Sequence, residues 1–411
     1  MVILFNTLGG IYEDQGEYEK AKKYFEKSLK IYEKIYGKDS IELTQFQSLA
    51  YLNYILGNYQ TSKEQFKRRI INELFFIQEE LPFLPLKDRE KFVQNIDIYN
   101  AGELYSIFKN EAKELALFSR LNAQGLINEI DSRQNKYISK LGKNNKLITD
   151  LKNINSRLSM MNINDDKKQI LLKEKDIIEK KLYRKLPELK PRIINISSVA
   201  DSIPKDGILI EFQKYTPTRF LEYFGIGINY FIDKSKGFLI ENIYDNSPAL
   251  IGGLREKDII ISVNQIPTKG LNIQKAEEFL INKTNLELVI SRGDKKFKKN
   301  LSKSKIIDWV PEEERYLAIT LNSKGKINIF DLGLSQIIDS KVNKAISSSE
   351  QGLIDAQSIW DELSNIILKP LQNEIIKSNT LFISPDSELN RVAFSALKDP
   401  KTLSFLSDKY K

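Results

Sequence analysis

The middle of the chain carries the run Ser247-Pro248-Ala249-Leu250-Ile251-Gly252-Gly253-Leu254-Arg255-Glu256-Lys257-Asp258-Ile259-Ile260-Ile261-Ser262-Val263-Asn264. Upstream of it stand the segments Phe224-Gly225-Ile226-Gly227-Ile228 and Gly237-Phe238-Leu239-Ile240-Glu241-Asn242-Ile243. Short apolar runs rich in β-branched residues and separated by glycine or charged turns are typical of strands. These stretches therefore predict a small strand-rich domain.

Together the segments resemble a PDZ domain of the type found in C-terminal processing proteases, over about residues 215–307. The resemblance implies a helix over residues 272–282 and a further strand from Leu286 to Arg292. Gly225 and Gly227 predict a loop whose successive N–H groups can surround a carboxylate. The strand that follows offers an open edge to an added peptide strand.

The resemblance implies a peptide-binding groove formed by Phe224, Gly225, Ile226, Gly227, Ile228, Ile273, Glu277 and Leu280. Ile226 and Ile228 are expected to line the pocket for the last side chain of the peptide. Across the groove, Ile273, Glu277 and Leu280 lie at i, i+4 and i+7 on one helix face, where Glu277 disfavours acidic peptides. We expect free C-termini as ligands, and the alternative is an insert that serves only in packing.

The N-terminus repeats itself after 41 residues. The recurring pairs are Phe5 and Phe46, Leu8 and Leu49, Gly16 and Gly57, Tyr18 and Tyr59, and Phe25 and Phe66. The spacing resembles the tetratricopeptide repeat, in which small residues let two antiparallel helices approach each other. We expect two such units over residues 1–72, which serve either as a stalk or as a peptide-binding groove.

Residues 73–190 read as a helical region. Leu147, Leu151, Ile154 and Leu158 form one apolar stripe, and a second stripe is formed by Ile170, Leu171, Ile177, Ile178 and Leu182. A polar turn over residues 162–166 separates the first stripe from the second. This pattern predicts a long antiparallel helical hairpin.

Strands are expected over residues 207–212, 315–321 and 327–331, on both sides of the inserted domain. A last strand is expected at the start of the run Leu381-Phe382-Ile383-Ser384-Pro385-Asp386-Ser387-Glu388-Leu389-Asn390-Arg391-Val392-Ala393-Phe394-Ser395-Ala396-Leu397. With Ala116–Ile130, Ile359–Leu363 and Leu368–Leu371, this run resembles the CHAT domain, a caspase-like relative of cysteine peptidases. The resemblance covers most of residues 110–214 and 308–411, so that residues 191–214 and 308–411 are expected to form a CHAT domain's N-terminal half.

The 411 residues include no histidine and no cysteine. This composition excludes a Cys nucleophile, a Ser-His-Asp triad, a zinc site of the usual ligands and a disulfide framework. CHAT peptidases need both residues, and we expect the chain to end before their positions. No residue is therefore assigned a catalytic role, and no cofactor or metal is expected.

The net charge of +8 is spread over lysines interleaved with Glu and Asp, which indicates a solvated surface and not a nucleic-acid site. No apolar run approaches the roughly 18 residues of a membrane span. We therefore expect a multidomain α+β protein of the cytoplasm, a non-catalytic scaffold for proteins or peptides. The alternative is one piece of a Cys-His peptidase whose catalytic half is encoded elsewhere or lost.

Overall fold

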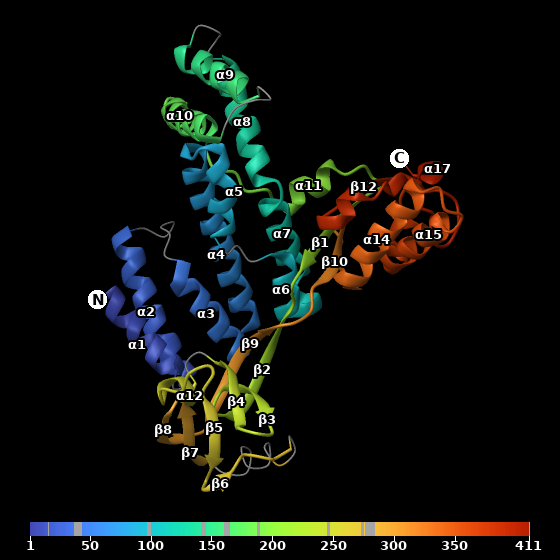
Figure 1. Cartoon of the computed structure of the whole chain (residues 1–411). Coiled ribbons are helices and arrows are strands. Elements are labelled where there is room, and N and C mark those ends of the chain that lie inside the picture. Colours follow the sequence, from blue (N-terminus) through green and yellow to red (C-terminus); the bar gives the residue numbers. More distant parts are fainter. Residues whose placement is uncertain are drawn as a thin grey trace. The chain divides into compact units, whose positions relative to one another are not determined.

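The structure is a computed structural model that describes residues 1–14, 16–36, 43–96, 100–140, 145–159, 165–186, 190–244, 247–272, 275 and 284–410. The chain divides into two compact units. The first comprises residues 1–38, 48–62 and 218–312, and the second comprises residues 39–47, 63–217 and 313–411. Each unit is described in turn (Figure 1).

The expected N-terminal repeats are two helix pairs. They consist of α1 (Val2–Asp14), α2 (Tyr18–Tyr36), α3 (Leu43–Ile55) and α4 (Tyr59–Glu80). Gly16 and Gly57, which are 41 residues apart, lie in the turns between paired helices with φ of 71° and 78°. Glycine recurs there because it adopts this left-handed conformation without steric cost. α4 continues across the boundary expected at Asn72.

Small residues bring the repeat helices together, as the sequence predicted. A Cβ atom at Gly9 would lie 2.9 Å from the Phe25 ring, so only glycine lets α1 approach α2 this closely. In the second pair, the Ser62 hydroxyl donates to the Ala50 carbonyl at 2.6 Å. The repeat core contains Ala21, Phe25, Leu49 and Leu52, with Tyr12, Tyr18 and Leu29 packed against it.

The first unit, which contains α1 and α2, also contains the inserted strand domain. β2 (Thr218–Gly225) and β9 (Ser304–Pro311) pair with each other as an antiparallel ribbon. The main sheet has the order β3 (Ile228–Asp233), β4 (Gly237–Ile243), β5 (Ile259–Val263), β7 (Asn285–Arg292) and β8 (Lys295–Ser302). β6 (Ile266–Pro267) pairs with β5, and α12 (Pro248–Ile251) follows β4.

Alternate residues of this sheet form one apolar core. Its fully buried members include Phe238, Ile240, Ile260, Leu288 and Ile290. The alternation explains the short apolar runs of the sequence, because successive side chains of a strand point to opposite faces. The strand-rich domain is therefore confirmed.

The second unit begins with helices. Beyond α4 these are α5 (Leu86–Gln94), α6 (Ala101–Phe108), α7 (Lys113–Ala123), α8 (Leu126–Lys140), α9 (Lys146–Leu158), α10 (Asp165–Tyr183) and α11 (Ile196–Ser202). Short 3-10 turns at residues 81–83 and 109–112 connect some of them.

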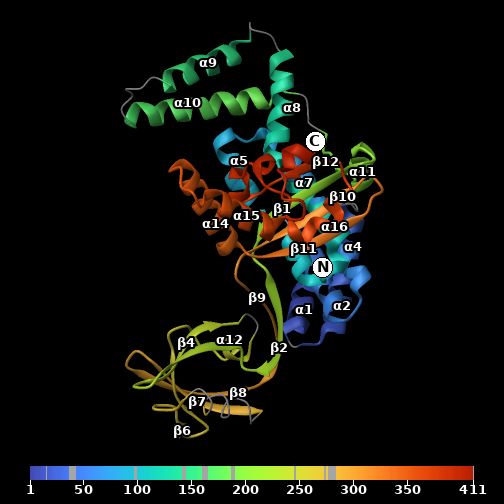
Figure 2. The same cartoon turned by 90° about the vertical axis from the view of Figure 1, so that its right-hand side faces the viewer.

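The expected hairpin is formed by α9 and α10, which lie side by side in Figure 2. Leu171 and Leu182 are buried, whereas Ile170 and Ile177 remain 57% and 53% exposed. Only part of the stripe expected on α10 is therefore covered by other described residues.

The second unit continues with a four-stranded sheet of order β11 (Ile327–Leu334), β10 (Arg315–Asn322), β1 (Gly207–Tyr215) and β12 (Thr380–Ser384). β10 is antiparallel to both of its neighbours, and β12 is parallel to β1. All four strands expected from the sequence thus belong to one sheet.

Helices pack on this sheet from both sides (Figure 1). α6 and α7 contact β1 and β11, and α14 (Ser335–Glu350) contacts β10 and β11. The remaining elements are α15 (Ala356–Ile367), α16 (Gln372–Ile375) and α17 (Leu406–Lys409), with 3-10 turns at residues 369–371, 387–391 and 394–396. The core between sheet and helices includes Ile210, Phe212, Val342, Leu363 and Leu389.

Candidate functional site

The loop between β2 and β3 is fixed by its carbonyl groups. The Ile226 carbonyl accepts from the Ala249 N–H at 2.9 Å, and the Gly227 carbonyl accepts from the Tyr244 N–H at 3.0 Å. In a trans peptide the C=O and the next N–H point in opposite directions. The N–H groups of Gly227 and Ile228 therefore point away from α12 and β4. Gly227 adopts φ of 75°, which its lack of a side chain permits.

The strand after this loop lies at the end of its sheet. Among the strands that the structure describes, β3 pairs with β4 alone. Ile228 lies opposite Ile243, and the hydrogen bond from Tyr244 to Gly227 makes this a non-hydrogen-bonded pair of the antiparallel ladder. The N–H and C=O of Ile228 consequently point away from β4, toward the open edge. This is the geometry that strand addition requires.

The two faces of β3 differ in polarity and burial. Ile228, Tyr230 and Ile232 pack against the core of the domain. Asn229 and Phe231 point to the opposite face and are exposed. A strand added at this edge would therefore meet apolar side chains on its inner face and a mixed surface on its outer face.

Of the eight predicted groove residues, the structure brings five together around this loop. Gly225 ends β2 opposite Ser304, and Phe224 before it is 58% exposed. Ile228 is half-buried, whereas Ile226 is only 4% exposed and belongs to the core. Ile226 thus anchors the loop to the core of the domain, and its expected role in lining the peptide pocket stays a prediction.

The other three predicted groove residues, Ile273, Glu277 and Leu280, lie outside the described residues. One hydrogen bond is described at the start of the helix expected to carry them. The Asn272 side-chain oxygen accepts from the Lys275 N–H at 3.0 Å, a bond typical of a helix N-cap.

Two contacts that the sequence did not single out stabilise the sheet around the loop. Asp258 is 1% exposed and accepts from the Nε and Nη2 atoms of Arg292 at 2.6 and 2.7 Å. This hydrogen-bonded pair joins the residue before β5 to the last residue of β7, and it raises the pKa of Arg292 above its ordinary value. Next to the loop, the Tyr244 hydroxyl donates to the Asn229 side chain at 2.9 Å. Neither pairing has a local sequence signal, because its partners are 15 or 34 residues apart in the sequence.

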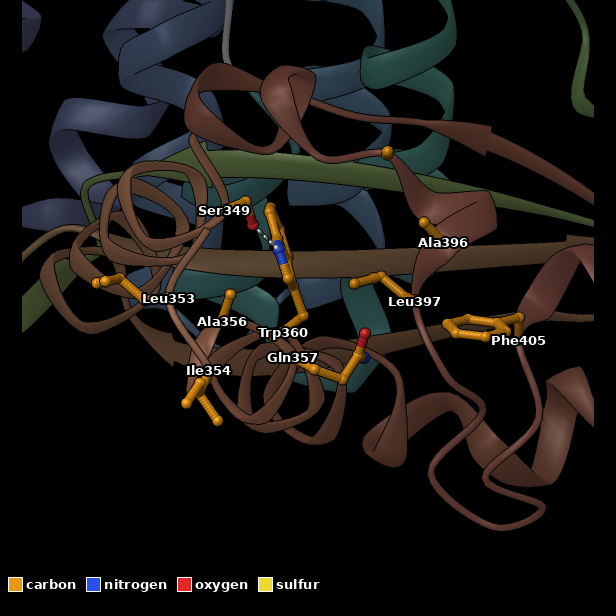
Figure 3. Close-up of a pocket in the computed structure, with 10 residues that line it drawn as sticks. Ser349, Leu353, Ile354, Ala356, Gln357, Trp360, Ala396, Leu397 and Phe405 are labelled. Carbon is orange, nitrogen blue, oxygen red and sulfur yellow. Dashed lines mark hydrogen bonds between the residues drawn. The ribbon is translucent and has the colours of Figure 1, made fainter. Parts of the chain in front are cut away.

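A separate apolar pocket of about 590 Å³ lies in the second unit (Figure 3). Trp360 and Phe405 contribute its aromatic surface, and none of its ten lining residues is charged. The Ser349 hydroxyl donates to the Ala345 carbonyl at 2.7 Å and accepts from the Trp360 indole N–H at 2.9 Å. With this hydroxyl hydrogen-bonded on both sides, the lining of the pocket is mainly apolar.

Buried charges in the second unit pair with one another. Arg120, 3% exposed, donates from Nε to the Glu211 carboxylate at 3.1 Å. The Lys214 N–H donates to Asp386 at 2.9 Å, which ties β1 to the turn after β12. Tyr316 donates its hydroxyl to Asp339 at 2.7 Å, and burial raises its pKa far above the ordinary range. These contacts hold the sheet to its neighbouring elements.

Within the described part of the chain, no group of three or more acidic side chains has the arrangement that could hold a metal ion. None of the helices placed there is long and apolar enough to cross a membrane.

Comparisons with known proteins identify two modules. The tetratricopeptide repeat family matches residues 1–70, and the PDZ domain family matches residues 217–291. Comparison with curated proteins gives no match.

Solved structures similar to part of this chain include a PDZ domain, a PDZ domain protein and a protease. The HtrA3 PDZ domain bound to a phage-derived ligand (FGRWV) is 22% identical over 22% of this chain and 92% of its own, with a TM-score of 0.19. A PDZ domain protein from Parabacteroides distasonis is 19% identical over 21% of each chain, with a TM-score of 0.19. The photosystem II D1 C-terminal processing protease is 20% identical over 22% of this chain and 28% of its own, with a TM-score of 0.19.

The two family matches agree with the helix pairs and with the strand domain described above. Both modules indicate protein or peptide partners. The chain is thus a multidomain α+β protein that combines tetratricopeptide repeats with a PDZ domain.

Proposed function

We propose that this protein is a non-catalytic scaffold whose PDZ domain binds the free C-terminus of a partner protein as an added strand on β3. The observation that carries the proposal is the orientation of Ile228, whose N–H and C=O both point to the open edge. The neighbouring Gly227 N–H points away from α12, so two donors stand at the start of the strand. Such donors suit a terminal carboxylate.

The proposal is tested by titrating the whole chain with peptides that differ only in a free or amidated C-terminus. A charge-assisted hydrogen bond contributes roughly 1.5–3 kcal/mol, so the free acid should bind about ten- to a hundred-fold more tightly. Equal affinities of acid and amide, or no binding of either across a diverse C-terminal library, would refute the proposal.

A pair of glycine variants separates binding from folding. Gly227→Val places a branched side chain beside the approaching peptide and should abolish binding. Gly270→Val is the matched control, because Gly270 also has a positive φ, 79°, lies in the same domain and has open space around it. Both variants place a β-branched residue at a similar positive φ, but only Gly227→Val should lose the peptide.

For the second unit we propose a CHAT-like fold without peptidase activity. The resemblance of residues 110–214 and 308–411 supports it, together with a mixed sheet in which β12 runs parallel to β1. The lack of His and Cys leaves no covalent cysteine mechanism. Incubation of the purified chain with a peptide library should show no cleavage. Turnover that survives thiol alkylation and disappears on replacement of a Ser or Lys would point to an enzyme instead.

A further inference from the structure

An apolar row crosses the outer face of the PDZ sheet and reaches its open edge. Phe231 of β3 pairs with Leu239 of β4, and Leu239 pairs with Ile259 of β5. Paired residues in antiparallel strands present their side chains on the same face, so the three form one row. Leu239 and Ile259 are half-buried, whereas Phe231 at the end of the row is 58% exposed.

The exposed end of this row coincides with the edge proposed to receive a peptide. Within the row, Leu239 has an apolar neighbour on each side, but among the described strands Phe231 has one on β4 only. A strand added to β3 would place its own side chain next to Phe231 on the outer face. An apolar residue at that point would continue the row by one position and cover the Phe231 ring.

The position of that residue follows from the ladder geometry. With its carboxylate at the Ile228 N–H, the peptide ends at the beginning of β3 and runs antiparallel to it. Its last residue then exchanges hydrogen bonds with Ile228 and lies directly opposite it. Counting back along the peptide, the third residue before the last lies opposite Phe231. That pair is non-hydrogen-bonded, the arrangement in which side chains approach most closely.

The other outer-face residue of β3 is polar. The residue just before the last lies opposite Asn229, which is exposed and accepts a hydrogen bond from the Tyr244 hydroxyl at 2.9 Å. A polar side chain held in this way offers no apolar surface. The outer face of β3 therefore distinguishes two peptide positions that are both solvent-facing.

From this arrangement we infer that Phe231 is a specificity-determining residue. The partner carries an apolar and preferably aromatic side chain three residues before its C-terminal residue. This inference rests on the C-terminal binding proposed above and adds a second point of recognition to it. The occupant is thus a protein terminus with an aliphatic last residue and an aromatic residue at this upstream position.

Two peptides of the same composition test the inference on the whole chain. One ends in Gly-Gly-Trp-Ala-Ser-Val and the other in Gly-Gly-Ser-Ala-Trp-Val, both as free acids. Aromatic contacts of this kind add about 0.5–1.5 kcal/mol, so the first peptide should bind about two- to ten-fold more tightly. Because the peptides differ only in order, a general hydrophobic gain cannot produce this preference.

Phe231→Ser should remove the preference and leave both peptides with nearly equal affinity. Ile251→Ser is the matched control, because Ile251 is 74% exposed in the same domain but belongs to α12, and it should keep the preference. Free-acid binding with a preference unchanged in Phe231→Ser would overturn the role of Phe231 and leave C-terminal binding intact. Absence of binding by every free-acid peptide would overturn both.

Discussion

Tyr215 and Arg315 are paired neighbours across β1 and β10, although the whole PDZ domain lies between them in the sequence. The chain therefore leaves the four-stranded sheet and returns to it at one point. The β2–β9 ribbon begins three residues beyond Tyr215 and ends at Pro311. The core of the sheet is built from residues on both sides of the insertion, including Phe212 and Ala318.

This relationship predicts that the second unit folds without the insertion. Directly paired residues of antiparallel strands lie about 4.5–5.5 Å apart, a span that a two-residue Asn-Gly turn closes. Replacement of residues 216–314 by Asn-Gly should therefore leave a chain that unfolds cooperatively in denaturant and keeps its near-ultraviolet circular dichroism. An aggregated or molten product would show that the insertion is needed to fold the sheet.

Substitution of the two adjacent glycines of α1 by alanine should change the stability of the first helix pair in opposite directions. A Cβ at Gly9 would meet the Phe25 ring at 2.9 Å, whereas nothing lies within 4 Å of a Cβ at Gly10. Gly9→Ala forces the ring to move within a packed cluster and should destabilise the first helix pair by about 1–3 kcal/mol. Gly10→Ala should stabilise it by up to about 1 kcal/mol, because alanine loses less backbone entropy in a helix.

Native-state hydrogen exchange of α1 and α2 is the measurement for these variants, since it reports the local opening free energy of the helix pair. Slower exchange in Gly10→Ala and faster exchange in Gly9→Ala are expected. A change of the same sign in both would mean that the close approach to Phe25 does not determine the choice of glycine at position 9.

Local chemistry made much of the fold predictable. Gly16 and Gly57 marked the turns because few other residues adopt a positive φ, and their spacing revealed the repeat. The strand domain was visible because Phe238 and Ile240 alternate with outward-facing residues. The loop at Gly227 could be predicted for the same reason, because glycine readily adopts a positive φ. In each case the signal lies within a few residues of the feature that it predicts.

What the sequence could not show depends on contacts between distant segments. The apolar stripe of α10 was visible in the sequence, but only packing decides that Leu171 is covered and Ile177 is not. Phe231 looked like any strand residue until the register placed it beside Leu239. The expected roles of Ile273, Glu277 and Leu280 stay predictions.

Asp399 should be one of the most important carboxylates for the stability of the second unit. It is 1% exposed and accepts from Lys409 Nζ and the Tyr410 hydroxyl, both at 2.9 Å, and from Gln372 at 3.1 Å. Asp399→Asn should lower the free energy of unfolding by roughly 2–4 kcal/mol, because the Lys409 ammonium and the neutral donors around it lose their buried, negatively charged acceptor. Glu362→Gln, which removes an exposed carboxylate paired with Lys341, should cost less than about 1 kcal/mol.

The effect of Asp399 should also depend on pH in a defined direction. Burial alone would raise the pKa of Asp399, but hydrogen bonds from Lys409, from two backbone N–H groups and from Tyr410 outweigh it and hold the pKa well below its ordinary value. A carboxyl whose pKa is lowered by folding stabilises the folded state above the unfolded pKa of about 3.9, and this stabilisation is lost as the pH falls toward the folded pKa. The free energies of unfolding of the natural chain and of Asp399→Asn should be measured in denaturant at pH 7 and at pH 3. Their difference should have its full size at pH 7 and should be smaller at pH 3. A difference that stays constant over this range would mean that the charge of Asp399 contributes nothing beyond the shape of its side chain.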